Sequence, residues 1–233
     1  MRRFGPAFGG WLVGLPFTCG PVALFVALER GPSFAARIAS GAIAGVTAEV
    51  AFVLGYFAVA SRGGSWLAGL AVGTATFFAA GLGIDATGAS LPVLLACAVG
   101  SLVLGLRIVP AGRPVVARET RWDLPLRLVL ATTLVLAITG LATTLGPGLS
   151  GLAITYPLIT STLAVFVHRS AGPAAAIAVY RGLLLGVFAL TAFASTLVLV
   201  LTRVPLGLAF LIALALMATA QLGTLPVLRR AQA

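Results

Sequence analysis

Long apolar stretches separated by short polar turns follow one another along the whole chain. A transmembrane helix needs about 20 apolar residues to cross roughly 30 Å of hydrocarbon. Eight segments of this kind cover residues 8–28, 34–60, 65–84, 89–108, 124–145, 149–168, 173–202 and 205–227. Because strands of a membrane barrel would alternate apolar and polar residues over about 10 positions, the pattern predicts an all-α polytopic membrane protein with about eight transmembrane helices.

The longest polar segment divides the chain into two halves of four predicted spans each. Residues 1–109 form the first half, residues 110–123 a cytoplasmic linker, and residues 124–233 the second half. Only 9% of the residues are charged and 60% are hydrophobic, whereas a soluble domain carries about 25% charged residues. The two halves are therefore expected to form a single bundle inside the membrane.

The arginines label the topology of this bundle. All 15 basic residues are arginines and the net charge is +10, but they lie at the ends of apolar segments and form no continuous basic face, which argues against a nucleic-acid partner. Basic residues accumulate on cytoplasmic loops. With the N-terminus inside, the inner side receives Arg2, Arg3, Arg62, Arg107, Arg113, Arg118, Arg121, Arg127, Arg169, Arg229 and Arg230, and the outer side only Arg30, Arg37 and Arg203. We expect a protein of the bacterial inner membrane with both termini in the cytoplasm.

Two groups of arginines have a second reading. In the linker, Arg113, Arg118 and Arg121 are expected to contact anionic lipid headgroups. At the N-terminus, Arg2 and Arg3 before an apolar run are also typical of a cleaved secretory signal. We interpret that run as a retained helix, because it has a counterpart later in the chain.

An internal repeat provides this counterpart. A shift of 141 positions aligns residues 5–80 with residues 146–221 without a gap, and 22 of the 76 aligned pairs are identical. The identical pairs include Gly5-Pro6 with Gly146-Pro147, Pro16 with Pro157, Gly31-Pro32 with Gly172-Pro173, and Arg62 with Arg203. Coincidence in an apolar chain of low complexity is the alternative, but hydrophobic bias does not explain Gly-Pro pairs that recur in one register.

The position of the two copies predicts their orientation. The first copy begins with the first predicted span and the second copy with the sixth, so the copies cross the membrane in opposite directions. This arrangement is an inverted-topology repeat with a pseudo-two-fold axis in the membrane plane, and many secondary transporters are built in this way. Repeats also occur in proteins that transport nothing, so the repeat alone does not decide the function.

Prolines interrupt the first span of each copy. Pro16 and Pro21 flank Thr18 in the first copy, and Pro157 precedes Thr160 in the second. Proline removes a backbone donor, and freed backbone groups inside a membrane are tolerated where they are buried or line a cavity. Paired interruptions in the two copies indicate a binding site in a repeat transporter. The alternative is a simple kink whose carbonyls are satisfied by nearby hydroxyls.

Two charges, Glu49 and Arg181, lie deep inside predicted spans at similar depth. An isolated charge there costs from about 2.5 to more than 10 kcal/mol, so we expect an ion pair between them across the repeat interface. The pair is either a structural lock, or Glu49 is a proton relay and Arg181 an anion anchor. The candidate binding residues are Pro16, Thr18, Pro21, Glu49, Pro157, Thr160 and Arg181.

Glycines and cysteines inside the spans are assigned to packing. Gly41 with Gly45, and Gly182 with Gly186, are spaced for close helix contact, either between spans 34–60 and 173–202 or against spans of their own halves. Cys19 and Cys97 are interpreted as buried small residues, because a disulfide framework or a zinc site needs more cysteines. With no recognisable catalytic motif, we expect neither an enzyme nor a bound metal or cofactor.

Part of the second half is similar to a known family. The stretch from Leu126 to Ala220, with GLAITYPL, LAVFVHR and RGLLLG, resembles the GlpM family of small bacterial membrane proteins. The resemblance implies a link to exopolysaccharide production and carries over no catalytic residue. The first half departs from it with Ala27 and Ser40 at the positions of His168 and Arg181. The chain would then be a fused, inverted duplication of such a unit.

Two functions therefore compete. The first is a small secondary transporter or exporter of an unknown solute, working by alternating access. The second is a non-catalytic membrane subunit or assembly factor, for example for envelope polysaccharide. Broken helices around a water-accessible cavity favour the first function, and a solid apolar interior favours the second. Besides the lipid bilayer and the solute, a homo-oligomeric partner is left open.

Overall fold

The computed structural model describes residues 5–17, 19–111 and 151–230, and every regular element in these ranges is a helix. The helices are α1 (Gly5–Val13), α2 (Cys19–Arg30), α3 (Pro32–Ala60), α4 (Trp66–Ala86), α5 (Leu91–Ile108), α7 (Leu158–Ala171), α8 (Pro173–Val200) and α9 (Leu206–Arg230). A short helical segment at residues 151–154 precedes α7. The predicted all-α class is confirmed for these residues.

Six segments of the described chain are long and apolar enough to cross a membrane. They are Pro32–Ala60, Trp66–Ala86, Leu91–Ile108, Gly151–Ala171, Pro173–Val200 and Leu206–Arg229. Each corresponds to one of the predicted spans, and together they fit a multi-pass membrane protein with apolar helices suited to contact with a lipid bilayer.

The other two predicted spans fare differently. Residues 8–28 do not form one helix, because α1 has only nine residues and α2 twelve, each shorter than a membrane crossing requires. Residues 124–145 lie outside the described residues, as does the linker after Ala111 with Arg113, Arg118 and Arg121. The described chain thus contains six of the eight predicted spans as single apolar segments.

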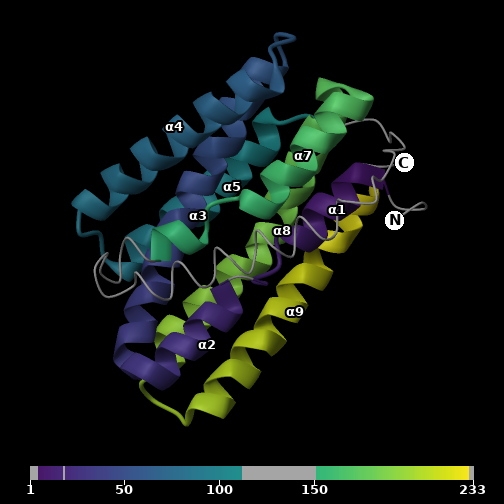
Figure 1. The fold of residues 1–233 in the computed structure, drawn as a ribbon. Coiled ribbons are helices and arrows are strands. Elements are labelled where there is room, and N and C mark those ends of the chain that lie inside the picture. Colours follow the sequence, from purple (N-terminus) through teal and green to yellow (C-terminus); the bar gives the residue numbers. More distant parts are fainter. Residues whose placement is uncertain (1–4, 18, 112–150, 231–233) are drawn as a thin grey trace.

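Two long helices form the centre of the bundle. α3 and α8 are largely buried, whereas α4, α5 and α9 are mostly exposed. Figure 1 shows α3 and α8 running in opposite directions, with α4 and α9 at opposite edges of the bundle. The exposed side chains of the outer helices are mainly apolar, among them Leu67, Phe78, Val99, Leu211 and Leu222. Such a surface is suited to hydrocarbon and unsuited to water.

The central helices begin in the same way. Gly31 precedes α3 and Gly172 precedes α8, and both have a positive φ, 86° and 87° respectively. A residue with a side chain rarely adopts this conformation, which explains the glycine. Proline is the first helical residue in both cases, where its missing N–H costs nothing. The two sharp turns therefore follow from Gly-Pro pairs that lie 141 positions apart.

Glycines place the short first helix of one half against the long helix of the other half. A Cβ atom added at Gly10 would lie within 3.0 Å of the backbone of Val179 and Leu183 on α8. One added at Gly151 would come equally close to the backbone of Ile38 and Ala42 on α3. The two contacts involve positions related by the shift of 141. In one, the first half contacts α8, and in the other, the second half contacts α3.

The glycine pairs of α3 and α8 receive these short helices. Gly182 and Gly186 contact the backbone of α1, whereas Gly45 contacts Thr155 and Gly41 contacts Gly151. The expected use of the glycines for close packing is confirmed. Their partner is the broken span of the opposite half, so the two predicted partners, the other central helix and the spans of the same half, were wrong.

The two cysteines have different environments. Cys19 is buried, as expected, whereas Cys97 on α5 is exposed, so the expectation of burial was wrong for Cys97. α5 is an outer helix with one packed face, and Cys97 lies on the other face.

Cys97 is therefore expected to react with a bulky apolar maleimide in detergent micelles at least about tenfold faster than Cys19. The rates are compared by intact mass in the single variants Cys19→Ser and Cys97→Ser. Equal rates in correctly folded protein would contradict the burial of Cys19.

A candidate binding cavity between two helix breaks

The first break separates α1 from α2 at Pro16. Proline has no N–H, and its ring clashes with the carbonyl four residues earlier, so the Leu12 carbonyl accepts from the Leu15 N–H instead, at 3.2 Å. The Leu15 carbonyl accepts from Phe17 at 2.7 Å, and the Pro16 carbonyl accepts from Gly20 at 2.8 Å. The chain thus makes one tight turn around Pro16 and resumes as α2.

The second break, at Pro157, has the same three backbone hydrogen bonds. The Ala153 carbonyl accepts from Tyr156, the Tyr156 carbonyl from Leu158, and the Pro157 carbonyl from Ser161, at 3.2, 2.7 and 2.8 Å. Pro157 itself has φ −76° and ψ 53°, close to the inverse γ-turn. The proline that the two halves share therefore produces the same local structure in both.

A small cavity lies between the two breaks. Its volume is about 50 Å³, and because a water molecule needs about 10–15 Å³ by this measure, it has room for a few waters or a small ion. The wall is formed by Val13, Gly14, Leu15, Pro16, Cys19, Glu49, Ile154, Thr155, Tyr156, Pro157, Leu158, Ile159, Thr160, Val187 and Leu190. Both breaks contribute, together with α3 and α8.

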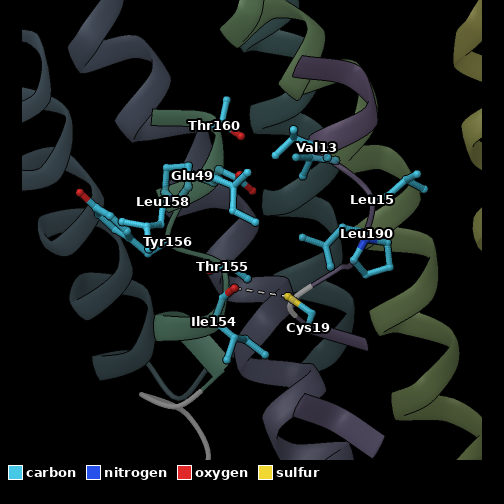
Figure 2. Close-up of a pocket in the computed structure, with 15 residues that line it drawn as sticks. Val13, Leu15, Cys19, Glu49, Ile154, Thr155, Tyr156, Leu158, Thr160 and Leu190 are labelled. Carbon is cyan, nitrogen blue, oxygen red and sulfur yellow. Dashed lines mark hydrogen bonds between the residues drawn. The ribbon is translucent and has the colours of Figure 1, made fainter. Parts of the chain in front are cut away.

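Glu49 is the charged residue of this wall. α3 carries it into the centre of the bundle, where its side chain is 5% exposed and its Oε2 atom has no hydrogen-bond partner. Figure 2 shows the Glu49 side chain between the residues of the two breaks. Leu190 of α8, at the position of Glu49 shifted by 141, lines the same cavity. The two halves thus form similar walls, of which only one carries a carboxylate.

Three other polar side chains of the wall, those of Cys19, Thr155 and Tyr156, already form hydrogen bonds. The Cys19 thiol donates to the Ile154 carbonyl at 3.4 Å, the contact drawn in Figure 2. The Thr155 hydroxyl donates to the Leu152 carbonyl at 2.7 Å. Tyr156 also lines the cavity, and its hydroxyl shares a hydrogen bond with Thr74 on α4 at 2.8 Å. Among the described residues of the wall, the Oε2 atom of Glu49 is the buried side-chain atom that has no hydrogen-bond partner.

Arg181 is not part of this cavity. Its guanidinium Nη1 donates to the Leu106 carbonyl at 2.7 Å and to the Val109 carbonyl, at the end of α5. Within the described residues no ion pair joins Arg181 to Glu49, so the predicted pair was wrong. The predicted similar depth did not suffice, because Arg181 bonds to the carbonyls at the end of α5 whereas Glu49 lines the cavity.

The remaining candidate residues divide into three groups. Pro16, Pro157 and Thr160 line the cavity together with Glu49. Only Pro157 and Thr160 are close to each other in the sequence. Pro21 lies in the first turn of α2 and is exposed, away from the cavity wall. Thr18 lies outside the described residues. The sequence reasoning missed Thr155, Tyr156, Val187 and Leu190. Applying the shift of 141 to Glu49 would have found Leu190.

His168 joins α7 to α3 at the end of the bundle. Its Nδ1 atom and the Tyr56 hydroxyl are 2.7 Å apart and share a hydrogen bond, and the Tyr56 ring packs on Tyr180 of α8 at 4.6 Å between centroids. Next to it, the Arg169 guanidinium lies over the Trp66 ring, 5.9 Å from its centroid. These contacts hold α7 against its neighbouring helices. Neither His168 nor Arg169 lines the cavity.

In comparisons with known proteins, no family model, no curated protein and no solved structure matches the chain. In the part of the chain that the structure describes, no group of three or more His, Cys, Asp or Glu side chains is arranged to hold a metal ion.

Proposed function

We propose that the protein is a small secondary transporter or exporter that works by alternating access about the cavity between the two helix breaks. The observation that carries the proposal is this cavity, in which two broken spans from the two halves face an unpartnered carboxylate. Discontinuous helices near the middle of the membrane form the substrate and ion sites of repeat transporters. A volume of about 50 Å³ restricts the bound species in this state to an ion or a very small solute.

Three observations support an inverted repeat behind this mechanism. α3 and α8 run in opposite directions (Figure 1), three backbone hydrogen bonds around Pro16 and Pro157 coincide under the shift of 141, and the contacts of Gly10 and Gly151 are reciprocal. A reciprocal contact is typical of two-fold symmetry, because residue i touches j and j touches i across such an axis. Rocking of one half against the other would expose the cavity to either side in turn.

The arginines of the described helices support the proposed orientation. The α3–α4 turn, the ends of α5 and α7, and the end of α9 lie towards one end of the bundle (Figure 1) and carry Arg62, Arg107, Arg169 and Arg229. The opposite end carries Arg30, Arg37 and Arg203. By the positive-inside rule, we propose that the first end is cytoplasmic, in the inner membrane of a bacterium.

Cysteine accessibility tests alternating access at two equivalent positions, Cys19 and Thr160. We expect a small charged thiosulfonate to modify Cys19, in a Cys97→Ala background, in membrane vesicles of both orientations. Thr160→Cys, with both native cysteines replaced, should behave in the same way. Both positions line the cavity, so an opening to either side would expose them.

A buried residue away from the cavity provides the matched control. Ala176 on α8 is fully buried and does not line the cavity, so Ala176→Cys should remain unmodified. Modification of the two cavity positions from one side only would contradict alternating access. Protection from both sides would overturn the transport proposal.

Such protection would favour the second proposal, a non-catalytic subunit or assembly factor. The observation on its side is the exposed apolar surface of α4, α5 and α9, which suits a lateral partner as well as lipid, including a second copy of the chain. The resemblance of residues 126–220 to the GlpM family would place such a subunit in envelope polysaccharide production. Anionic lipids at the linker arginines fit either function.

A further inference from the structure

We propose that the species bound in the cavity is a proton, carried by Glu49. The inference rests on the proposed function and specifies its coupling ion. It starts from the cavity geometry, in which the Glu49 carboxylate is buried, unpartnered and placed between two helix breaks. An ionised carboxylate without a partner inside a membrane is costly, so the group either holds a cation or carries a proton.

A metal cation does not fit the oxygen atoms of the wall. Hard cations such as Ca²⁺ take six to eight oxygen ligands, and here Glu49 is the only carboxylate. The wall carbonyls of Leu15, Pro16, Ile154, Tyr156 and Pro157 already accept hydrogen bonds. A proton needs only one carboxylate oxygen, and the cavity supplies one that has no other partner.

An anion does not fit the charge of the wall. The N-terminal ends of α2 and α7 lie at the cavity and favour negative charge, but Glu49 supplies that charge from the protein itself. The cation that would anchor an anion, Arg181, is bonded to the end of α5. The two helix ends therefore moderate the cost of the ionised state of Glu49, which lets the proton leave as well as bind.

Few other titratable or charged side chains lie near Glu49. The helices packed on α3 carry these titratable or charged side chains: Cys19, Glu29 and Arg30 on α2, Asp85 on α4, Cys97 and Arg107 on α5, and Tyr180 and Arg181 on α8. The turn before α7 adds Tyr156. Of these only Cys19 and Tyr156 line the cavity, and neither forms a hydrogen bond with Glu49.

Infrared difference spectroscopy tests the proposal without a known solute. The spectrum of the wild-type protein minus that of Glu49→Gln, in lipid nanodiscs, should contain the C=O stretching band of one protonated carboxyl at neutral pH. The band should disappear reversibly as the pH is raised and should be unaffected by Na⁺ or K⁺. Glutamine has the size of a protonated glutamate, so the variant is expected to keep the fold, which size-exclusion chromatography checks.

Two results would overturn the proposal. One is a difference spectrum with only ionised-carboxylate bands across neutral and acidic pH. The other is a protonated band that Na⁺ or K⁺ abolishes at constant pH, which would identify a metal cation as the occupant. The exposed Asp85, replaced by Asn, is the matched control, and this replacement should leave the Glu49 band unchanged. If Glu49 titrates but Cys19 and Thr160→Cys are protected from both sides, the proton site stands and the transport proposal fails.

Discussion

Gly182→Ala is expected to destabilise the folded protein strongly, although alanine is the better helix former. A Cβ atom at Gly182 would lie within 3 Å of the backbone of Ala7 and Trp11 on α1, and backbone atoms in a packed helix cannot move aside as a flexible side chain can. Overpacking of this kind costs about 1–3 kcal/mol. We expect a clearly lower midpoint of thermal unfolding in detergent, and failure of α1 to dock with Gly182→Leu.

Gly100→Ala is the matched control on an outer helix. An added Cβ at Gly100 on α5 would meet nothing within 4 Å, and alanine improves helix propensity over glycine by up to about 1 kcal/mol. The midpoint should therefore stay the same or rise. Equal losses for Gly100→Ala and Gly182→Ala would show that the helix contact at Gly182 is not as close as described.

Arg181→Met is the second substitution with a large expected effect. It removes the donor shared by the Leu106 and Val109 carbonyls at the end of α5, and methionine offers these acceptors no hydrogen bond in its place. Hydrogen bonds to a charged group contribute about 1.5–3 kcal/mol. We expect a marked fall in thermal stability, with partial recovery in Arg181→Lys, because an ammonium donates to carbonyls from a similar position.

Arg37→Met serves as the control for the loss of an arginine. The Arg37 guanidinium lies over the Phe34 ring at 5.4 Å and is exposed, a contact of about 0.5–1 kcal/mol. Its replacement should therefore lower stability by less than the replacement of Arg181. If Glu49→Gln lowered stability as much as Arg181→Met, an interaction between the two charges would return to consideration.

Local patterns predicted many of the helices and their ends. The Gly-Pro pairs at residues 31–32 and 172–173 occupy equivalent positions in the two aligned segments, and α3 and α8 begin there. Pro16 and Pro157 predicted interruptions, and the chain turns at both. These predictions succeeded because proline and glycine act on the backbone directly, through φ and a missing donor, whatever surrounds them.

Contacts between helices were predicted less well, because a sequence shows depth along a helix but not the direction in which a side chain points. Glu49 and Arg181 were predicted to lie at similar depth, yet one lines the cavity and the other bonds to the end of α5. Gly182 was predicted to pack against span 34–60 or within its own half, but it packs against α1. Cys97 lies among apolar residues in the sequence, yet it is exposed. A membrane helix is apolar on its exposed face too, so apolar neighbours do not predict burial.

The sequence by itself determined that the chain is helical and suited to a membrane, that 22 of 76 residue pairs are identical at a spacing of 141, and that the chain turns at Pro16 and Pro157. Each of these follows from hydrophobicity or from backbone chemistry, which are properties of short segments. Only the tertiary structure decided that both breaks meet at one cavity and that Glu49, without Arg181, faces it. That outcome depends on the rotation of each helix about its axis, which close packing of glycines against neighbouring backbones sets.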